Sequence, residues 1–393
     1  MQTAMSISRW CQLVLALVIS APSIAKVSGT FYAAQGVAYN DGGNFIAQDG
    51  QLEANYFEFA ANAHWRLTPR WRFAGQVTRR QLGDFISEDT AVDYLFGRYQ
   101  YPLKQGHLSA TLGRFKNDFG WYNASRDSLF SRPSILLPSS IYREWGRDAA
   151  LRRDGLLLNG LHYWGQQSLS WSLSYGEVDF SDQFTQNLFG SSRLYQTQSR
   201  GATSATVSWQ YRPWWQLKYS YSQTRFEVQG TPAALLNGGF SEAYFNVDTH
   251  LLSLRSEWQR WQLIAEWQRQ PIQQTFPQLG AQISPVSDGG YIQLRYLVHD
   301  QWQLYGRRDL FWANDNDRNG QQVVAPLPNY SAYARTWMLG SSWQITSDWQ
   351  LSLEWHRLEG AGTLPQWQVV QLGQAPTSHL YLLQLAYRWS WAR

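Results

Sequence analysis

Residues 349–356 read Trp-Gln-Leu-Ser-Leu-Glu-Trp-His, and residues 261–268 read Trp-Gln-Leu-Ile-Ala-Glu-Trp-Gln. In both stretches apolar side chains occupy every second position. Leu351 and Leu353 would therefore share one face of a β-strand, while Glu354 would lie on the other. The pattern predicts a sheet whose two faces meet different environments.

The triplet Trp-Gln-Leu occurs four times, beginning at Trp215, Trp261, Trp302 and Trp349, with spacings of 46, 41 and 47 residues. Each copy follows a short polar turn, and long polar segments separate the copies. These segments cover residues 181–200, 229–246, 271–288, 313–331 and 359–378. Short turns alternating with long loops, and Trp at the strand starts, are typical of bacterial outer-membrane barrels.

The alternating segments predict about sixteen strands in an all-β, transmembrane, antiparallel up-and-down barrel. An even number places both chain ends on the same side. The predicted strands cover residues 29–39, 53–67, 71–81, 90–101, 108–115, 155–164, 169–177, 202–211, 215–226, 248–258, 261–270, 290–298, 302–311, 332–344, 349–358 and 380–391.

The alternative for a Trp motif at this period is a β-propeller, whose blades have a similar length. A blade must fit four short strands into one period. Here each period holds one long loop, one tight turn and two strands of about ten residues, as barrels do. The pattern therefore favours the barrel.

The composition agrees with a barrel. Of the 393 residues, 44% are hydrophobic and only 16% are charged, whereas soluble domains average about 25% charged residues. This mixture is too apolar for a disordered chain. No stretch reaches the roughly 18 consecutive apolar residues of a spanning helix. The net charge of +4 is too small to indicate a nucleic-acid binder.

Residues 1–25 are predicted to be a signal peptide, with Arg9 before the apolar core 13–19 and a small-x-small cleavage site at residues 23–25. The mature chain, 26–393, would form the barrel in the outer membrane. The single cysteine, Cys11, lies in the signal peptide, so disulfides and cysteine-ligated metals are excluded from the mature chain.

Residues 116–153 differ from the other loops. Between Arg114 and Asp154 there are eight basic and five acidic residues, and residues 135–137 form an apolar patch between two prolines. Such a patch can pack against the barrel wall if the loop folds inward, where it would narrow a pore. The alternative is an external loop whose arginines pair with its own acids. The predicted constriction residues are Arg114, Lys116, Arg126, Asp127, Arg132, Arg143 and Arg147.

The stretch Gly113-Arg114-Phe115-Lys116, with Phe119-Gly120 and residues 125–127, resembles the corresponding segment of Gram-negative outer-membrane porins, in particular the phosphate-selective kind. The resemblance implies a sixteen-stranded barrel, commonly trimeric, that passes small hydrophilic or anionic solutes. The lysine cluster of that kind is not recognisable, since only four of the 33 basic residues are lysines.

Some charged residues alternate with apolar neighbours along a predicted strand and therefore lie on the opposite face. These residues are predicted to line the pore wall. Five basic residues face four acidic ones, which indicates a mixed wall with a slight anion preference. Ion pairs that brace the wall are the alternative for any single residue. The predicted wall residues are Arg72, Lys218, Arg255, Glu257, Glu266, Arg295, Arg307, Asp309 and Glu354.

Other motifs are weaker. Residues 315–320 match half of a calcium loop, but Pro326 stands where the bidentate Glu should be. Glu354 and His356 share one face and are the best candidates for a hydrolase site.

From the barrel pattern and the charged residues, we expect a passive channel with no cofactor and no metal. A barrel enzyme acting on lipid or peptide, and a closed structural or adhesive barrel, are the rival hypotheses.

Overall fold

The structure is a computed structural model that describes residues 26–83, 86–211 and 214–392. The predicted signal peptide lies outside these residues. The strands are β1 Lys26–Asp41, β2 Leu52–Arg66, β3 Trp71–Leu82, β4 Ile86–Leu103, β5 Gly106–Lys116, β6 Arg152–Trp164, β7 Gln167–Glu177, β8 Tyr195–Tyr211, β9 Trp215–Gly230, β10 Glu242–Trp258, β11 Trp261–Phe276, β12 Ala281–Ile283, β13 Val286–His299, β14 Trp302–Trp312, β15 Tyr333–Gln344, β16 Trp349–Gly360 and β17 Thr377–Ala392.

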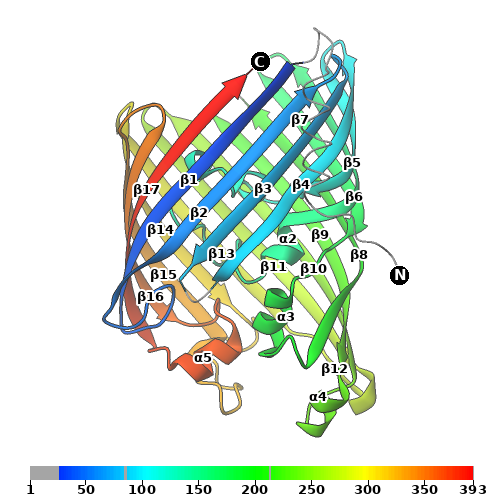
Figure 1. Ribbon diagram of the computed structural model, residues 1–393, viewed down its shortest axis with the longest axis vertical. Coiled ribbons are helices and arrows are strands. Elements are labelled where there is room, and N and C mark those ends of the chain that lie inside the picture. Colours follow the sequence, from blue (N-terminus) through cyan, green and yellow to red (C-terminus); the bar gives the residue numbers. More distant parts are fainter. Residues whose placement is uncertain (1–25, 84–85, 212–213, 393) are drawn as a thin grey trace.

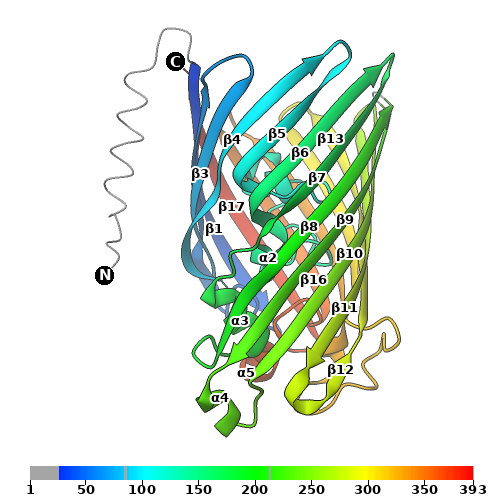
Figure 2. The same cartoon turned by 90° about the vertical axis from the view of Figure 1, so that its right-hand side faces the viewer.

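The strands form one antiparallel sheet that closes on itself, because β1 pairs with β2 on one side and with β17 on the other. β12 pairs only with the end of β11, and β11 continues the barrel by pairing with β13. The barrel therefore has sixteen strands, tilted as Figure 1 and Figure 2 show. Each predicted strand overlaps one of them, so the predicted fold is confirmed.

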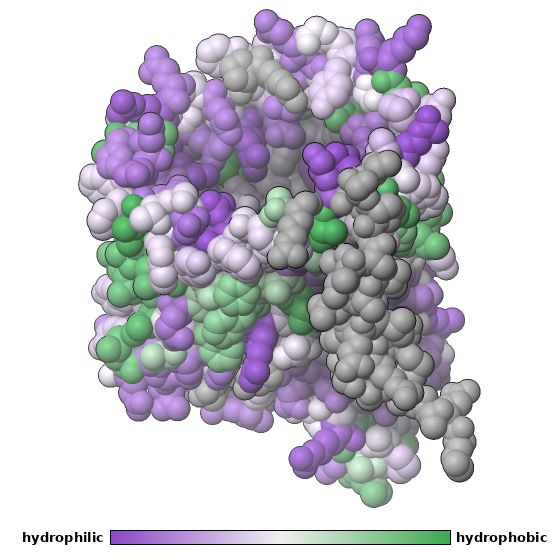
Figure 3. Space-filling view, turned by 45° about the horizontal axis from the view of Figure 1, so that its top comes forward, coloured by the Kyte–Doolittle hydropathy of each residue, from purple (hydrophilic) through white to green (hydrophobic). Residues whose placement is uncertain are grey.

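The two faces of the wall are inverted relative to a soluble protein. On β7, Leu173 is 50% exposed and Tyr175 is 62% exposed, whereas Ser172 and Ser174 are 2% and 7% exposed. The apolar side chains point outward and the small polar ones point into the barrel. Figure 3 shows hydrophobic patches over the outer wall and hydrophilic side chains around the rim.

The two ends of the barrel differ. One end, which we call the short-turn end, carries Lys26, Ala392 and the turns at 67–70, 104–105, 165–166, 259–260, 300–301 and 345–348. The other, the long-loop end, carries most of the helices: α3 Asp182–Phe189, α4 Pro232–Leu236, α5 Gln366–Leu372, η3 Pro277–Leu279 and η4 Asn329–Ala332. In Figure 1 the short-turn end is at the top.

The strands extend further toward the long-loop end than the sequence predicted. β8 begins at Tyr195 rather than at residue 202, and β9 ends at Gly230 rather than at residue 226. Alternation of apolar and polar residues marks only the part of a strand that has lipid on one face. Backbone pairing continues beyond that part, where water wets both faces and the pattern is lost. Within the described residues, no helix is long and apolar enough to cross a membrane.

Candidate functional site: a segment inside the barrel

The chain between β5 and β6, residues 117–151, runs within the barrel and includes η1 Asn123–Ser125, η2 Leu129–Ser131 and α2 Arg147–Leu151. We call it the inner segment. Figure 1 and Figure 2 both draw α2 within the outline of the wall. The inner segment contacts inward-facing side chains on both sides of the barrel, as described below.

Two carboxylates of the wall bind backbone N–H groups of the inner segment. Glu266 on β11 accepts hydrogen bonds from the Trp121 N–H at 3.0 Å and from the Tyr142 hydroxyl at 2.6 Å. Glu354 on β16 accepts from the N–H groups of Ile135 and Leu136. A charged acceptor strengthens such bonds, so these two glutamates hold the segment at two separate points.

Two cations of the wall bind carbonyl oxygens of the same segment. Lys218 on β9 donates to the Gly120 carbonyl at 2.9 Å, and Arg307 on β14 donates to the Leu136 carbonyl at 3.1 Å. The backbone of the inner segment is therefore bound by cations and anions from four strands, β9, β11, β14 and β16. The contact at Leu136 does not depend on its side chain. Gly120 must lack a side chain, because its φ is +60° and a Cβ there would collide with the Tyr142 hydroxyl and lie 2.8 Å from a Glu266 oxygen.

The wall formed by β2, β3 and β4 binds side chains of the inner segment. Arg132 makes a bidentate pair with Glu58 on β2. Glu144 accepts from Arg80 on β3 at 2.7 Å and from Arg126 within the segment.

On β4, Asp93 pairs with Arg147 at 3.2 Å. Arg147 also pairs with Asp127, which Lys116 contacts at 2.7 Å. These side chains are almost fully buried. Leaving one member of such a buried network without its partner costs several kcal/mol.

The ion pairs set the ionisation of the acids of the segment. Burial by itself would raise the pKa of Glu144, but the guanidinium groups of Arg126 and Arg80 outweigh burial and hold that pKa well below its ordinary value. Arg147 and Lys116 likewise hold the pKa of Asp127 well below its ordinary value, against the effect of burial. Both carboxylates are therefore ionised at neutral pH.

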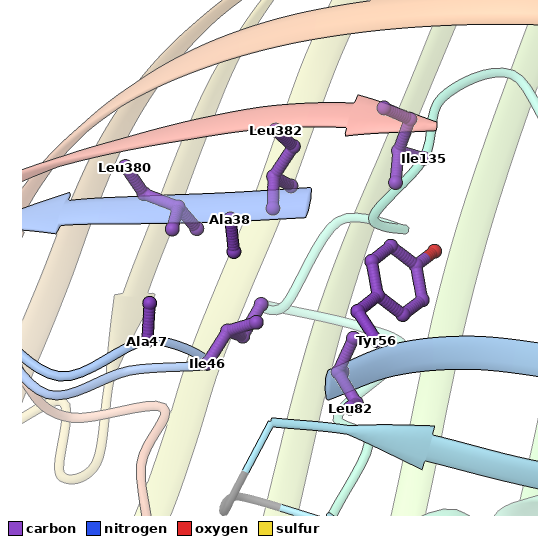
Figure 4. Packing of buried hydrophobic residues seen from close by; sticks show 8 residues of the cluster. All are labelled: Ala38, Ile46, Ala47, Tyr56, Leu82, Ile135, Leu380 and Leu382. Atoms are coloured by element: carbon purple, nitrogen blue, oxygen red, sulfur yellow. The ribbon is translucent and has the colours of Figure 1, made fainter. Parts of the chain in front are cut away.

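Apolar packing adds a further attachment. Ile135 is 3% exposed and packs with wall residues that include Tyr56, Leu380 and Leu382, together with Ile46 of the β1–β2 loop (Figure 4). A second cluster contains Phe119, Tyr122, Leu137, Ile141 and Tyr142 from the segment with Leu251, Ile264 and Tyr291 from the wall. The apolar patch at residues 135–137 thus has its partners inside the barrel.

Among the predicted constriction residues, Arg143 differs from the rest of the segment. Arg126, Arg132 and Arg147 each pair with carboxylates. Within the described part of the chain, Arg143 has no carboxylate at ion-pair distance, and its guanidinium lies 4.2 Å from the centre of the Phe311 ring. Burial is the main influence on the Arg143 pKa and lowers it.

Arg143 also lines two cavities. One, of about 190 Å³, includes Phe184, Phe226 and Gln268 in its lining. The other, of about 50 Å³, is bounded partly by Arg307, and Asp309 on its wall is 4% exposed. Arg143 is therefore the cation of the segment best placed to meet a solute.

Arg114 was predicted to lie at the constriction, and the structure places it on the outer face of the barrel instead. It stands directly opposite Leu95, whose side chain is 64% exposed on the outer face, and it pairs with Asp154 and Asp179. In a strand, a shift of one position moves a side chain to the other face. Arg114 therefore belongs to the outer surface of the barrel, away from the inner segment.

Eight of the nine predicted wall residues divide into three groups, and the ninth, Asp309, borders the cavity of about 50 Å³ that Arg143 lines. Lys218, Glu266, Arg307 and Glu354 bind the inner segment. Arg255 lies 4.8 Å from the Trp121 ring, and Arg295 donates to Gln262 at 2.9 Å. Arg72 and Glu257 are exposed near the short-turn end.

The candidate hydrolase pair is present but engaged. The His356 Nε2 atom lies 2.9 Å from a carboxylate oxygen of Glu354, and both side chains are buried. Glu354 also accepts from the Tyr305 hydroxyl at 2.9 Å and from the backbone of Ile135. These contacts give Glu354 a positioning role toward the segment. In the half calcium loop, Asp315 pairs with Arg269.

Sequence reasoning missed Glu58, Arg80 and Asp93, which bind the segment from β2, β3 and β4. The parity rule used for the other wall residues could have found two of them. Glu58 lies between Phe57 and Phe59, and Asp93 lies between Val92 and Tyr94. No signal in the sequence says which basic residue each acid meets, because the partners are 54–74 residues away.

The closed antiparallel barrel with an apolar outer face places this chain in the fold class of bacterial outer-membrane barrels. Among solved structures, in-vitro folded OmpT, an outer membrane protein of Vibrio cholerae, is similar over 94% of this chain and 99% of its own, with 10% identity and a TM-score of 0.57.

An anion-selective porin from Comamonas acidovorans is similar over 93% of this chain and 99% of its own, with 10% identity and a TM-score of 0.55. Pseudomonas putida OprB covers 97% of both chains, with 13% identity and a TM-score of 0.57. At these identities the shared feature is the fold. Neither family models nor curated protein sequences give a match to this sequence.

Proposed function

We propose that this protein is an outer-membrane porin, a passive diffusion channel for small hydrophilic solutes with a mild anion preference. The observation that carries the proposal is the inverted wall, with apolar side chains outside and a charged, polar interior crossed by one anchored segment. Several proteins of the same fold are named porins or channels, including the anion-selective porin and the channel DcaP of Acinetobacter baumannii. The short-turn end would face the periplasm.

The inner segment, within residues 116–153, would be the constriction. Charges in a confined space of low dielectric constant act strongly on a passing ion. Arg143 would carry the anion preference, helped by Arg255 and Arg295, since no described carboxylate forms an ion pair with any of these three cations. Arg126, Arg132 and Arg147 would hold the segment in place.

The test is the single-channel conductance of the folded protein in a planar bilayer, with a salt gradient that gives the reversal potential. We expect stepwise increases in current as single channels insert, and a reversal potential whose sign shows that anions permeate better than cations. Arg143→Glu should shift that potential toward cations, because it replaces a positive charge at the constriction with a negative one.

The matched control is Arg357→Glu, which makes the same charge change at an exposed position of the outer wall. It should leave the reversal potential unchanged. An equal shift in both variants would remove Arg143 from the proposal. Correctly folded protein without any conductance would reject the open channel.

A barrel closed by its inner segment is the second candidate. It is favoured by the burial of Arg126, Tyr142 and Leu151, which are at most 3% exposed. Replacing residues 117–150 by a short Gly-Ser linker separates the two candidates. An open porin should gain conductance from a measurable starting value, whereas a closed barrel should change from silent to conducting.

The same purified protein can be used to test the oligomeric state and the enzyme hypothesis. One OmpT structure of this fold is described as a trimer form. We propose a homotrimer here, and native mass measurement in detergent would give the mass of three chains. His356→Ala should leave the conductance unchanged, and loss of a lipid or peptide hydrolase activity in that variant would favour the enzyme hypothesis.

A further inference from the structure

Four basic residues form one row across four neighbouring strands at the short-turn end. In the register of the sheet, Lys26 on β1 is paired with Arg66 on β2, Arg66 with Arg72 on β3, and Arg72 with Arg98 on β4. Directly paired residues have Cβ atoms about 5 Å apart. The row therefore places four positive charges side by side over roughly 15 Å.

The row faces the interior of the barrel. Arg72 lies between Trp71 and Phe73, which are 44% and 38% exposed on the outer face. Arg98 donates to the Thr111 hydroxyl at 2.8 Å, and Thr111 is fully buried on the inner face of β5. Alternation in register then gives Arg66 and Lys26 the same inward direction.

The row lines an open cavity. A cavity of about 650 Å³ at this end is lined by all four residues of the row and by His64, and its described lining residues include no carboxylate side chain. His64 stands one inward position along β2 from Arg66. The charged part of the described lining therefore consists of cations and of one side chain that becomes a cation when protonated, and the rest includes Trp65, Phe73 and Phe96.

Nothing described on these strands neutralises the row. Glu58 and Asp93, the nearest inward-facing carboxylates of β2 and β4, are eight and five residues away, which is roughly 26 and 17 Å along an extended strand. Both are already paired with Arg132 and Arg147 of the inner segment.

Like charges directly opposite each other destabilise a sheet. Repulsion within the cationic row therefore raises the free energy of the folded protein, and no described ion pair offsets this effect. It differs in this respect from Arg126, Arg132 and Arg147 of the inner segment, each of which is paired with a carboxylate.

We propose that this row, Lys26, Arg66, Arg72 and Arg98, binds a small multivalent oxyanion at the short-turn mouth of the barrel. Guanidinium groups offer planar pairs of donors that match the oxygens of phosphate and carboxylate groups. Neighbouring basic side chains whose Cβ atoms are about 5 Å apart suit a ligand with two or more anionic groups. A monovalent ion such as chloride can meet only part of the row.

Equilibrium binding at this row requires no conductance, so the site is separate from the proposed diffusion channel. The channel and the site can therefore fail separately. Conductance without oxyanion binding would retain the porin and reject the site, and binding without conductance would retain the site and reject the channel.

The experiment is calorimetric titration of the folded full-length mature protein in detergent with inorganic pyrophosphate, at constant ionic strength set with sodium chloride. We expect saturable binding that Arg72→Gln weakens by roughly tenfold or more, since one charge-assisted contact to an anion is lost. Arg66→Gln should act in the same direction. In further titrations at higher fixed concentrations of sodium chloride, the binding should weaken.

Arg357→Gln is the matched control, since it removes the same charge from an exposed outer position and should change the affinity less than twofold. The side chains of Arg66 and Arg72 make no hydrogen bond or ion pair with another described residue, and heat-modifiable mobility on gels checks that the variants are folded. The proposal is overturned if pyrophosphate does not bind, or if Arg72→Gln and Arg66→Gln bind it as the control does.

Discussion

At the scale of single residues, the charged side chains of this protein have two distinct environments. Arg132 and Glu58 are buried and paired with each other. Arg143 is buried beside Phe311 without an ion pair to any described carboxylate. The same residue type can therefore anchor a segment or present a charge to a solute, and the partner decides which.

Arg132→Met should destabilise the folded protein by about 3 kcal/mol, because it leaves the Glu58 carboxylate buried and unpaired. The measurement is urea unfolding in lipid vesicles. Replacing both partners, as Glu58→Gln with Arg132→Met, should recover part of the loss. Equal stabilities of the single variant and the wild type would show that the pair contributes nothing.

The acids of the inner segment give a defined pH dependence. The pKa values of Glu144 and Asp127 lie below their ordinary values in the folded protein. Their contribution to stability is therefore present above the unfolded-state pKa of about 4 and is lost as the pH falls below it.

We expect the free energy of unfolding to fall steeply from about pH 5 downward. Unfolding measured between pH 7 and pH 3 tests this expectation. Glu144→Gln should be less stable at pH 7 and show a shallower slope. A slope unchanged in that variant would mean that Glu144 does not contribute to it.

At the scale of elements, the inner segment is tied to the wall by ion pairs, hydrogen bonds to its backbone and apolar packing together. The attachments to Glu266, Glu354 and Arg307 use its backbone, whereas Ile135 uses a side chain. The segment should consequently tolerate changes at its exposed positions better than at Ile135.

Ile135→Ala should destabilise the protein by about 2–5 kcal/mol, since it leaves a cavity among well-packed wall residues. It should also increase the noise of single-channel currents, because one attachment of the segment is weakened. Leu236→Ala is the control, since Leu236 is 89% exposed. Ile135→Ala with the stability of this control would contradict the packing role.

The sequence predicts an element well when the same surroundings act on every copy of that element. All sixteen strands were found because lipid imposes the same alternation on each of them. The ends of β8 and β9 were missed because that alternation stops outside the lipid. Arg114 was placed at the constriction because of its charge, although it lies in the predicted strand 108–115 and shares the outer face of that strand with Leu112.

At the scale of the whole molecule, the outer face of the wall should be the surface in contact with lipid. Leu353 is 55% exposed in the middle of the β16 sequence, and Trp349 begins that strand at the short-turn end. A charge in the middle of the lipid costs more than a charge near its edge.

Leu353→Arg should destabilise the protein in bilayers by about 2–4 kcal/mol, and Trp349→Arg by about 0–1 kcal/mol. Urea unfolding in lipid vesicles measures both values. The reverse order would place the membrane elsewhere on the barrel. Equal small effects would mean that this face does not meet lipid.

The sequence alone determined the barrel, its strand number and the outward direction of the apolar side chains, because these follow from a period of two residues along the chain. Only the tertiary structure decided which arginines are neutralised and which are free to meet an anion. Glu58, Asp93 and the row from Lys26 to Arg98 come from strands whose register is set by closure of the whole sheet. A charge is neutralised by whatever lies near it in space, and a local pattern carries no information about that neighbour.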